Sequence, residues 1–262
     1  MADPLSTKVG AMSSHVLNQL HRKRSQSDHN SNILFVAVQG PQGSGKTFLT
    51  STLRNALTSP PHSLSVAVLS IDDLYLPHTE LVALARANPH NGLLQGRGQP
   101  GTHDVKLGTQ ILSQLKHINE LSSSPVQIPS FDKSLFSGEG DRAATGMTVC
   151  RPVDVVILEG WCVGFYPTTQ EEISERWAMP VQGLGEDFFG KRGFRKEDVV
   201  EINERLKEFL EWWKFFDTFI QVGLVDHYFV QDIDLIGLNR SNLLRVIRMT
   251  TYTSGVYNRN IL

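Results

Sequence analysis

Continuous apolar runs recur along this chain, and several of them end in small or acidic residues. Residues 33–38 (ILFVAV) are entirely apolar, and residues 64–73 (LSVAVLSIDD) pass from apolar residues to two acids. A third run, residues 153–165 (VDVVILEGWCVGF), contains an acid and a glycine, and residues 217–222 (DTFIQV) form a shorter run. Such runs are typical of strands that are buried on both faces, as in a parallel sheet.

Segments with apolar residues at helical spacing separate these predicted strands. We predict helices over residues 45–57, 105–121 and 197–216, and a short helix around residues 12–20. Residues 21–32 (HRKRSQSDHNSN) are polar and basic and predict a solvated linker, with a short nuclear import signal as the alternative. Residues 167–196 are rich in glycine and charge and predict an irregular segment. The alternation predicts an α/β fold with a parallel sheet flanked by helices on both faces.

The sequence GPQGSGKT, residues 40–47, lies between the first predicted strand and the helix that follows it. In this G-x-x-x-x-G-K-T spacing, glycines permit a tight turn and bring backbone N–H groups against a phosphate at the helix N-terminus. Lys46 would reach the β- and γ-phosphates, and the Thr47 hydroxyl would ligate magnesium. An ordinary glycine-rich turn is the alternative, but the strand and helix on either side favour nucleotide binding. The predicted nucleotide-binding residues are Gly40, Gln42, Gly43, Ser44, Gly45, Lys46, Thr47 and Phe48.

Acidic residues end two other predicted strands. Asp72 and Asp73 end the second strand, at the edge of an open α/β sheet where ligands bind. Asp72 is the better candidate for a base that takes a proton from an attacking hydroxyl, although capping of the next turn is the alternative for both acids. Glu159 ends the third strand and would hold magnesium, directly or through water, together with Thr47. We therefore assign catalytic roles to Asp72, Lys46 and Glu159.

Two predicted loops add cations. Residues 95–104 (QGRGQPGTHD) and 128–142 (IPSFDKSLFSGEGDR) carry arginine, lysine and histidine among glycines. These cations would clamp an anionic substrate or the transferring phosphate, whereas the alternatives are a solvated surface loop and a helix cap at Thr102 or Asp104. The predicted substrate-binding residues are Asp73, Tyr75, Arg97, His103, Asp104, Lys133 and Arg142.

Composition narrows the class of partner. The 262 residues are 40% hydrophobic and 20% charged, which fits one large α/β domain with a buried core. A formal net charge of −2 argues against a nucleic-acid binder that works by phosphate neutralisation. The two cysteines, Cys150 and Cys162, suggest neither a disulfide framework nor a zinc site. We find no membrane span and no secretory signal, so we expect a cytoplasmic location.

With these motifs in this order, the chain resembles the small-molecule kinases of the phosphoribulokinase, uridine kinase and pantothenate kinase group. Within that group it is most similar to the D-glycerate 3-kinase branch, which includes fungal glycerate-kinase-like proteins. The residues that carry the resemblance are GPQGSGKT, SIDDLYLP, GRGQPGTHD, PSFDKSLFSGEGDR and LEGWCVGF, within residues 33–222. The resemblance implies a P-loop kinase fold, ATP with Mg²⁺ and a small hydroxylated acceptor. By position, Asp72 matches the acid used toward the acceptor hydroxyl, and Glu159 matches the strand-end acid.

The last part of the chain departs from that family. We divide the chain into an N-terminal helix and linker (residues 1–31), a P-loop kinase domain (32–222) and an atypical tail (223–262) in place of the expected lid. In the tail, LLRVIRM predicts a short helix, with Arg240, Arg245 and Arg248 as substitute cations. Three functions stay open: a kinase of D-glycerate, a kinase of a nucleoside, pantothenate or another metabolite, and a nucleotide-binding protein impaired by its tail. A GTPase switch is disfavoured because no guanine-recognition motif is found.

Overall fold

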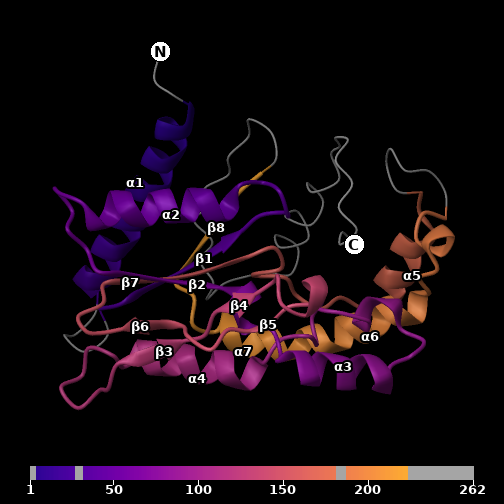
Figure 1. Ribbon diagram of the computed structural model, residues 1–262. Coiled ribbons are helices and arrows are strands. Elements are labelled where there is room, and N and C mark those ends of the chain that lie inside the picture. The colour runs from indigo at the N-terminus through magenta and orange to yellow at the C-terminus, as the bar shows by residue number, and fades with distance from the viewer. Residues whose placement is uncertain (1–3, 27–31, 181–186, 224–262) are drawn as a thin grey trace.

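A four-stranded parallel sheet forms the centre of the molecule (Figure 1). The computed structural model describes residues 4–26, 32–180 and 187–223. The strand order is β2–β7–β1–β8, and every pair is parallel. The strands are β1 (Leu34–Gln39), β2 (Val66–Ser70), β7 (Val155–Gly160) and β8 (Thr218–Gln221). The parallel sheet predicted from the apolar runs is confirmed.

Different helices cover the two faces of the sheet, because side chains alternate between faces along a strand. Leu34, Val36 and Val38 share one core with α1 and α2, whereas Phe35 and Ala37 share the other core with α4 and α7. Figure 1 shows α1 and α2 above the sheet, and α4 and α7 below it. These helices are α1 (Pro4–Gln26), α2 (Lys46–Thr58), α4 (Val105–Lys116) and α7 (Leu210–Trp213).

Shorter elements surround this framework. Strands β3 and β6 form one antiparallel pair, and β4 and β5 form another. The strands are β3 (Val126–Ile128), β4 (Phe131–Asp132), β5 (Asp141–Arg142) and β6 (Met147–Val149). The remaining α-helices among the described residues are α3 (His78–Ala87), α5 (Gln170–Ala178) and α6 (Lys196–Leu206). The motifs gave no prediction of α3. Helix α5 corrects the prediction that residues 167–196 are irregular throughout.

The N-terminal helix is longer than its apolar pattern predicted. Helix α1 continues to Gln26, so the basic residues expected in a linker are helical up to that point. Lys23 pairs with Asp217 at 2.5 Å, and Arg24 pairs with Asp154. The buried side chains of α1, including Met12 and Val16, are part of the core that α2 and β1 share. Tertiary contacts with distant acids therefore extend a helix that local polarity predicted to end.

The second and third strands are shorter than the apolar runs predicted. Strand β2 ends at Ser70, and Asp72 and Asp73 lie in the 3₁₀ turn Ile71–Leu74. Strand β7 ends at Gly160, whose position leaves no room for a Cβ because Ile71 packs against it. The turn and the strand end therefore pack directly against each other, which brings the two acidic positions to one edge of the sheet.

Two predicted helices also end or break early. Helix α4 ends at Lys116, and the segment after α6 passes through the 3₁₀ turn Lys207–Phe209 before α7. None of the helices in the described ranges is long and apolar enough to cross a membrane. The predicted tail, with Arg240, Arg245 and Arg248, lies outside the described residues beyond Gly223.

Candidate active site

One edge of the sheet brings the three strand-end motifs together. The phosphate-loop sequence follows β1, the turn with Asp72 follows β2, and Glu159 lies near the end of β7. Glu159 is in register with Val38 on one side and Ser70 on the other. Because all strands are parallel, their carboxyl ends meet at this edge, where open α/β sheets bind ligands.

The loop after β1 has the backbone of an anion site. Gly43 and Gly45 have φ values of 79° and 76°, a region that side-chain-bearing residues rarely adopt. Helix α2 then begins with no side-chain N-cap and no acidic residue in its first turn. Its first N–H groups and the positive end of its dipole are therefore available to a phosphate.

Two predicted nucleotide-binding side chains differ in their surroundings. Phe48 is 62% exposed, so its side chain makes little contact with the phosphate loop. A contribution of Phe48 to nucleotide binding would come from its backbone N–H group. The buried hydroxyl of Ser44 has no hydrogen-bond partner. An unsatisfied buried hydroxyl costs free energy, and a bound phosphate would remove that cost.

Glu159 has the chemistry of a magnesium ligand. Its side chain is 3% exposed, and its Oε2 atom is buried without a hydrogen-bond partner. Its Oε1 atom accepts a hydrogen bond from the Thr47 hydroxyl at 3.2 Å. Burial raises the pKa of Glu159, and the charge of Lys46 and bonds from Ser70 and Thr47 offset this only in part. Carboxylate and hydroxyl oxygens are ligands that Mg²⁺ prefers, so the pair fits this cation.

The metal would also need oxygens from its nucleotide. Within the described residues, no group of three histidine, cysteine or acidic side chains lies close enough to hold an ion. A site with one or two protein ligands and substrate phosphates is the usual arrangement for Mg²⁺ in kinases.

Asp72 lies between two donors. The Tyr75 hydroxyl donates to Oδ1 at 3.2 Å, and the Lys133 ammonium donates to Oδ2 at 2.5 Å. Burial raises the pKa of Asp72, but the hydrogen bond and charge of Lys133, together with the charge of Lys46, bring it below its ordinary value. Asp72 is therefore ionised at neutral pH and can accept a proton.

His103 is buried beside this acid. Its residue is 4% exposed, and neither ring nitrogen has a hydrogen-bond partner. Its ring lies 4.3 Å from the ring of Tyr75, and the two residues form an isolated antiparallel bridge. Burial lowers the pKa of His103 to about 4, so its imidazole is neutral at pH 7.

Hydrogen bonds hold the β4–β5 hairpin against the turn after β2 and fix two of the predicted cations, Arg97 and Arg142. Asp73 accepts a bond from the Phe131 N–H at 3.0 Å, so its carboxylate anchors the hairpin. Arg97 donates to the Gly138 carbonyl at 2.6 Å.

Arg142 donates to the Tyr75 carbonyl at 3.0 Å and to Asp104 at 3.2 Å. Asp104 also caps α4 through the Leu107 N–H, as its alternative interpretation predicted.

Sequence patterns missed two contributors to this arrangement. The side chain of Ser70 accepts a bond from the Asp72 N–H at 3.3 Å, which fixes the turn after β2. Serine directly before a short turn is a recognised signal for this bond. The backbone N–H of His78, at the start of α3, donates a hydrogen bond to Asp141 in the β4–β5 hairpin at 2.8 Å and so connects the two elements. No local signal in the sequence indicates that contact.

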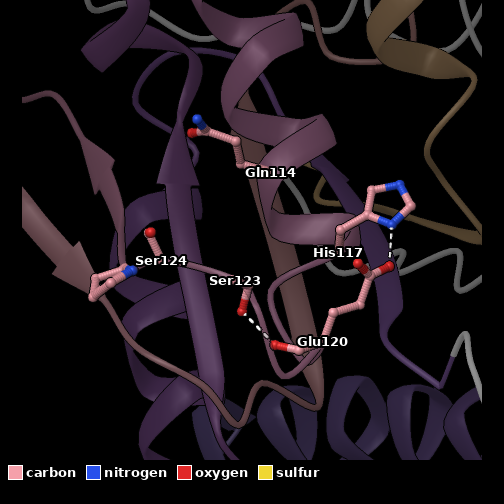
Figure 2. A pocket seen from close by; sticks show the side chains of 6 residues that line it. Gln114, His117, Glu120, Ser123 and Ser124 are labelled. Atoms are coloured by element: carbon pink, nitrogen blue, oxygen red, sulfur yellow. Dashed lines mark hydrogen bonds and ion pairs between the residues drawn. The ribbon is translucent and has the colours of Figure 1, made fainter.

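A separate hollow of about 300 Å³ lies at the other end of α4 (Figure 2). His117 and Glu120 contact each other there at 2.6 Å. The lining residues are Gln114, His117, Glu120, Ser123, Ser124 and Pro125. None of them belongs to the group around Asp72, which lies at the N-terminal end of α4.

Three comparisons with known proteins show what this chain is similar to. No protein-family model matches the chain. The chain is 45% identical over 139 residues to the probable ATP-dependent kinase TDA10 of Saccharomyces cerevisiae, covering 52% of this chain and 48% of that protein. It is 28% identical over 214 residues to the chloroplastic D-glycerate 3-kinase of Arabidopsis thaliana, covering 80% of this chain and 42% of that protein. The chain thus spans about half the length of the curated relatives it matches.

A solved structure gives a longer match. The D-glycerate 3-kinase from Cryptococcus neoformans superposes on this chain with a TM-score of 0.74 and 38% sequence identity. The match covers 81% of this chain and 72% of the other. The similarity therefore includes both the backbone and a substantial part of the sequence.

Proposed function

The chain belongs to the D-glycerate 3-kinase family of P-loop kinases, and from that membership we propose that it transfers the γ-phosphoryl group of ATP to a hydroxyl group of D-glycerate. The observation that carries the proposal is the position of Asp72. Its carboxylate lies after β2 at the same sheet edge as the phosphate loop and Glu159. A base at this edge can reach a hydroxyl that faces the terminal phosphate.

In the proposed reaction, the acceptor hydroxyl gives its proton to Asp72 while its oxygen forms a bond to the γ-phosphorus. The bond from that phosphorus to the β–γ bridging oxygen breaks, and ADP leaves. Lys46 and the N–H groups at the start of α2 offset the negative charge of the phosphates. Thr47 and Glu159 would hold Mg²⁺, which supplies further charge neutralisation when bound.

D-glycerate is proposed as the acceptor because of charge. The predicted cations Arg97, Lys133 and Arg142 all come from the loops around Asp72. Arg97 and Arg142 donate to backbone carbonyl groups, and Arg142 also pairs with Asp104. Lys133 pairs with Asp72 through an exposed side chain and can exchange that partner for a carboxylate. A small hydroxycarboxylate therefore suits the site better than a neutral nucleoside.

The test is ADP release by the purified full chain with ATP and magnesium, with and without D-glycerate. We expect ADP release that depends on D-glycerate and is lost in Asp72→Asn. The matched control is Glu211→Gln, which removes a carboxylate from an exposed pair with Lys214, also at 2.5 Å. Turnover only with a nucleoside or pantothenate would replace D-glycerate as the acceptor. No turnover with any of these acceptors would overturn the proposed activity.

A further inference from the structure

The pair between Lys133 and Asp72 constrains the proposed base before any acceptor arrives. Both carboxylate oxygens of Asp72 already accept a hydrogen bond, one from Tyr75 and one from Lys133. Each oxygen keeps a further lone pair, so an incoming hydroxyl is not excluded by space alone. The obstacle is basicity, because an ammonium group 2.5 Å away stabilises the ionised carboxylate and weakens it as a proton acceptor.

The two donors to Asp72 differ in their freedom to leave. Tyr75 is 3% exposed, and its backbone is paired with His103. The Lys133 side chain is 55% exposed. An ammonium group that is open to solvent is screened and competes with water for its partner, so an incoming anion can take over such a group at little cost. Lys133 is therefore the donor that can change partner.

The hairpin that carries Lys133 does not need to move for this exchange. The Phe131 N–H is held by Asp73 on one side of Lys133, and the Gly138 carbonyl is held by Arg97 on the other. Asp132 also accepts two bonds from Ser134, which fixes the turn around the lysine. Only the flexible side chain of Lys133 must rotate, and its ammonium stays close to Asp72.

We propose that Lys133 is a specificity-determining residue that releases Asp72 only when the acceptor brings its own negative charge. The inference rests on the proposed function. A carboxylate on the acceptor takes over the ammonium group, and Asp72 becomes a stronger base for the hydroxyl of the same molecule. Water and neutral alcohols carry no such charge, so Asp72 stays paired and phosphoryl transfer to them stays slow. The acceptor class is thus small hydroxycarboxylates, and the same contact limits wasteful ATP hydrolysis.

The first test compares Lys133→Met with the matched control Lys214→Met, which removes an exposed lysine from a pair of the same length at the C-terminal end of α7. ADP release is measured with D-glycerate, with glycerol and without any acceptor. In Lys133→Met we expect the ratio of kcat/KM for D-glycerate over glycerol to fall at least tenfold, and acceptor-free hydrolysis to rise several-fold. Lys214→Met should change neither quantity. An unchanged ratio, or slower acceptor-free hydrolysis in Lys133→Met, would overturn the proposal.

A second readout separates this role from simple carboxylate binding and does not need turnover. Carboxyl-carbon NMR follows the titration of Asp72, which also faces Lys46, Tyr75 and His103 and the acids Asp73 and Glu159. Adding D-glycerate should raise the pKa of Asp72 in the unsubstituted chain, and glycerol should not. In Lys133→Met the pKa of Asp72 should already be raised, and D-glycerate should raise it further by less than in the unsubstituted chain, because only the direct effect of its charge remains. If D-glycerate leaves the Asp72 titration unchanged, the exchange of partners does not occur. If ADP release fails while the NMR response is present, only the proposed function is refuted.

Discussion

Replacing Gly160 with alanine should displace the turn that carries Asp72 and so disrupt the candidate site. Gly160 ends β7 next to Glu159, and a Cβ there would lie 2.3 Å from Ile71 Cγ2 and 3.0 Å from Val163 Cγ2. Ordinary contacts begin at 3.4 Å, so Ile71 must move by about 1 Å. Overpacking of this kind typically costs about 1–3 kcal/mol. For a chain of this size, that corresponds to a fall in Tm of roughly 2–10 °C.

The same movement should reach the proposed base, because Asp72 directly follows Ile71 in the 3₁₀ turn. A displacement of about 1 Å in a reacting group can lower the rate roughly 100-fold. We therefore expect Gly160→Ala to lower kcat for D-glycerate-dependent ADP release far more than it changes the KM for ATP. Both quantities are measured at 20 °C.

Gly10→Ala provides the matched control. Gly10 lies inside α1, and nothing is within 4 Å of the position its Cβ would take. Alanine in a helix interior stabilises by about 0.5–1 kcal/mol relative to glycine, so this variant should have a slightly raised Tm and unchanged kcat. If Gly160→Ala is as stable and as active as Gly10→Ala, the end of β7 does not pack closely against the turn that carries Asp72, and the reasoning is refuted.

Three further predictions concern the metal site, pH and the core. Glu159→Gln should keep the fold but lose the magnesium-dependent part of the rise in Tm that ATP causes. In the unsubstituted chain, ATP at 100 times its Kd should raise Tm by about 5–10 °C in differential scanning fluorimetry. An unchanged magnesium effect in Glu159→Gln would show that Glu159 does not hold the cation. Burial lowers the pKa of His103 from 6.5 to about 4, so the folded state binds fewer protons than the unfolded state between these values. Its contribution to stability is complete above pH 6.5 and should fall by roughly 3 kcal/mol as the pH drops to 4, in urea titrations; His103→Phe should flatten this dependence, and equal slopes would contradict it. Phe209→Ala, at a fully buried ring, should cost about 3–5 kcal/mol in the same titrations, and a cost below 1 kcal/mol would contradict its place in the core.

Local chemistry was sufficient for the phosphate loop. The residues from Gly40 to Thr47 are contiguous, and their order of strand, glycine-rich turn and helix can be predicted without any distant contact. The edge position of Glu159 could also be predicted, because strands that are buried on both faces are parallel and their carboxyl ends meet. Element ends were less predictable: β2 ends at Ser70 rather than at Asp73 because the next residues form a 3₁₀ turn.

The partners of the predicted cations could not be read from local sequence. Lys133 lies 61 residues from Asp72, and Arg142 lies 38 residues from Asp104. The loop composition indicated an anion but not which lysine or arginine would be fixed in the fold. The structure separates them by their contacts: Arg97 and Arg142 donate to backbone carbonyls, and Arg142 also pairs with Asp104, whereas Lys133 pairs with Asp72 through an exposed side chain.

The phosphate loop, the parallel sheet and the acids at its edge can be predicted from the sequence, because they depend on contiguous patterns and on the geometry of strands. The donors that contact Asp72 and the helical conformation of the basic end of α1 follow from contacts that form only in the folded chain. The neutral state of His103 likewise follows from its burial in the fold. Each of these depends on groups brought together from distant parts of the chain or on burial, and hydrogen bonds and pKa values follow that three-dimensional environment rather than sequence spacing.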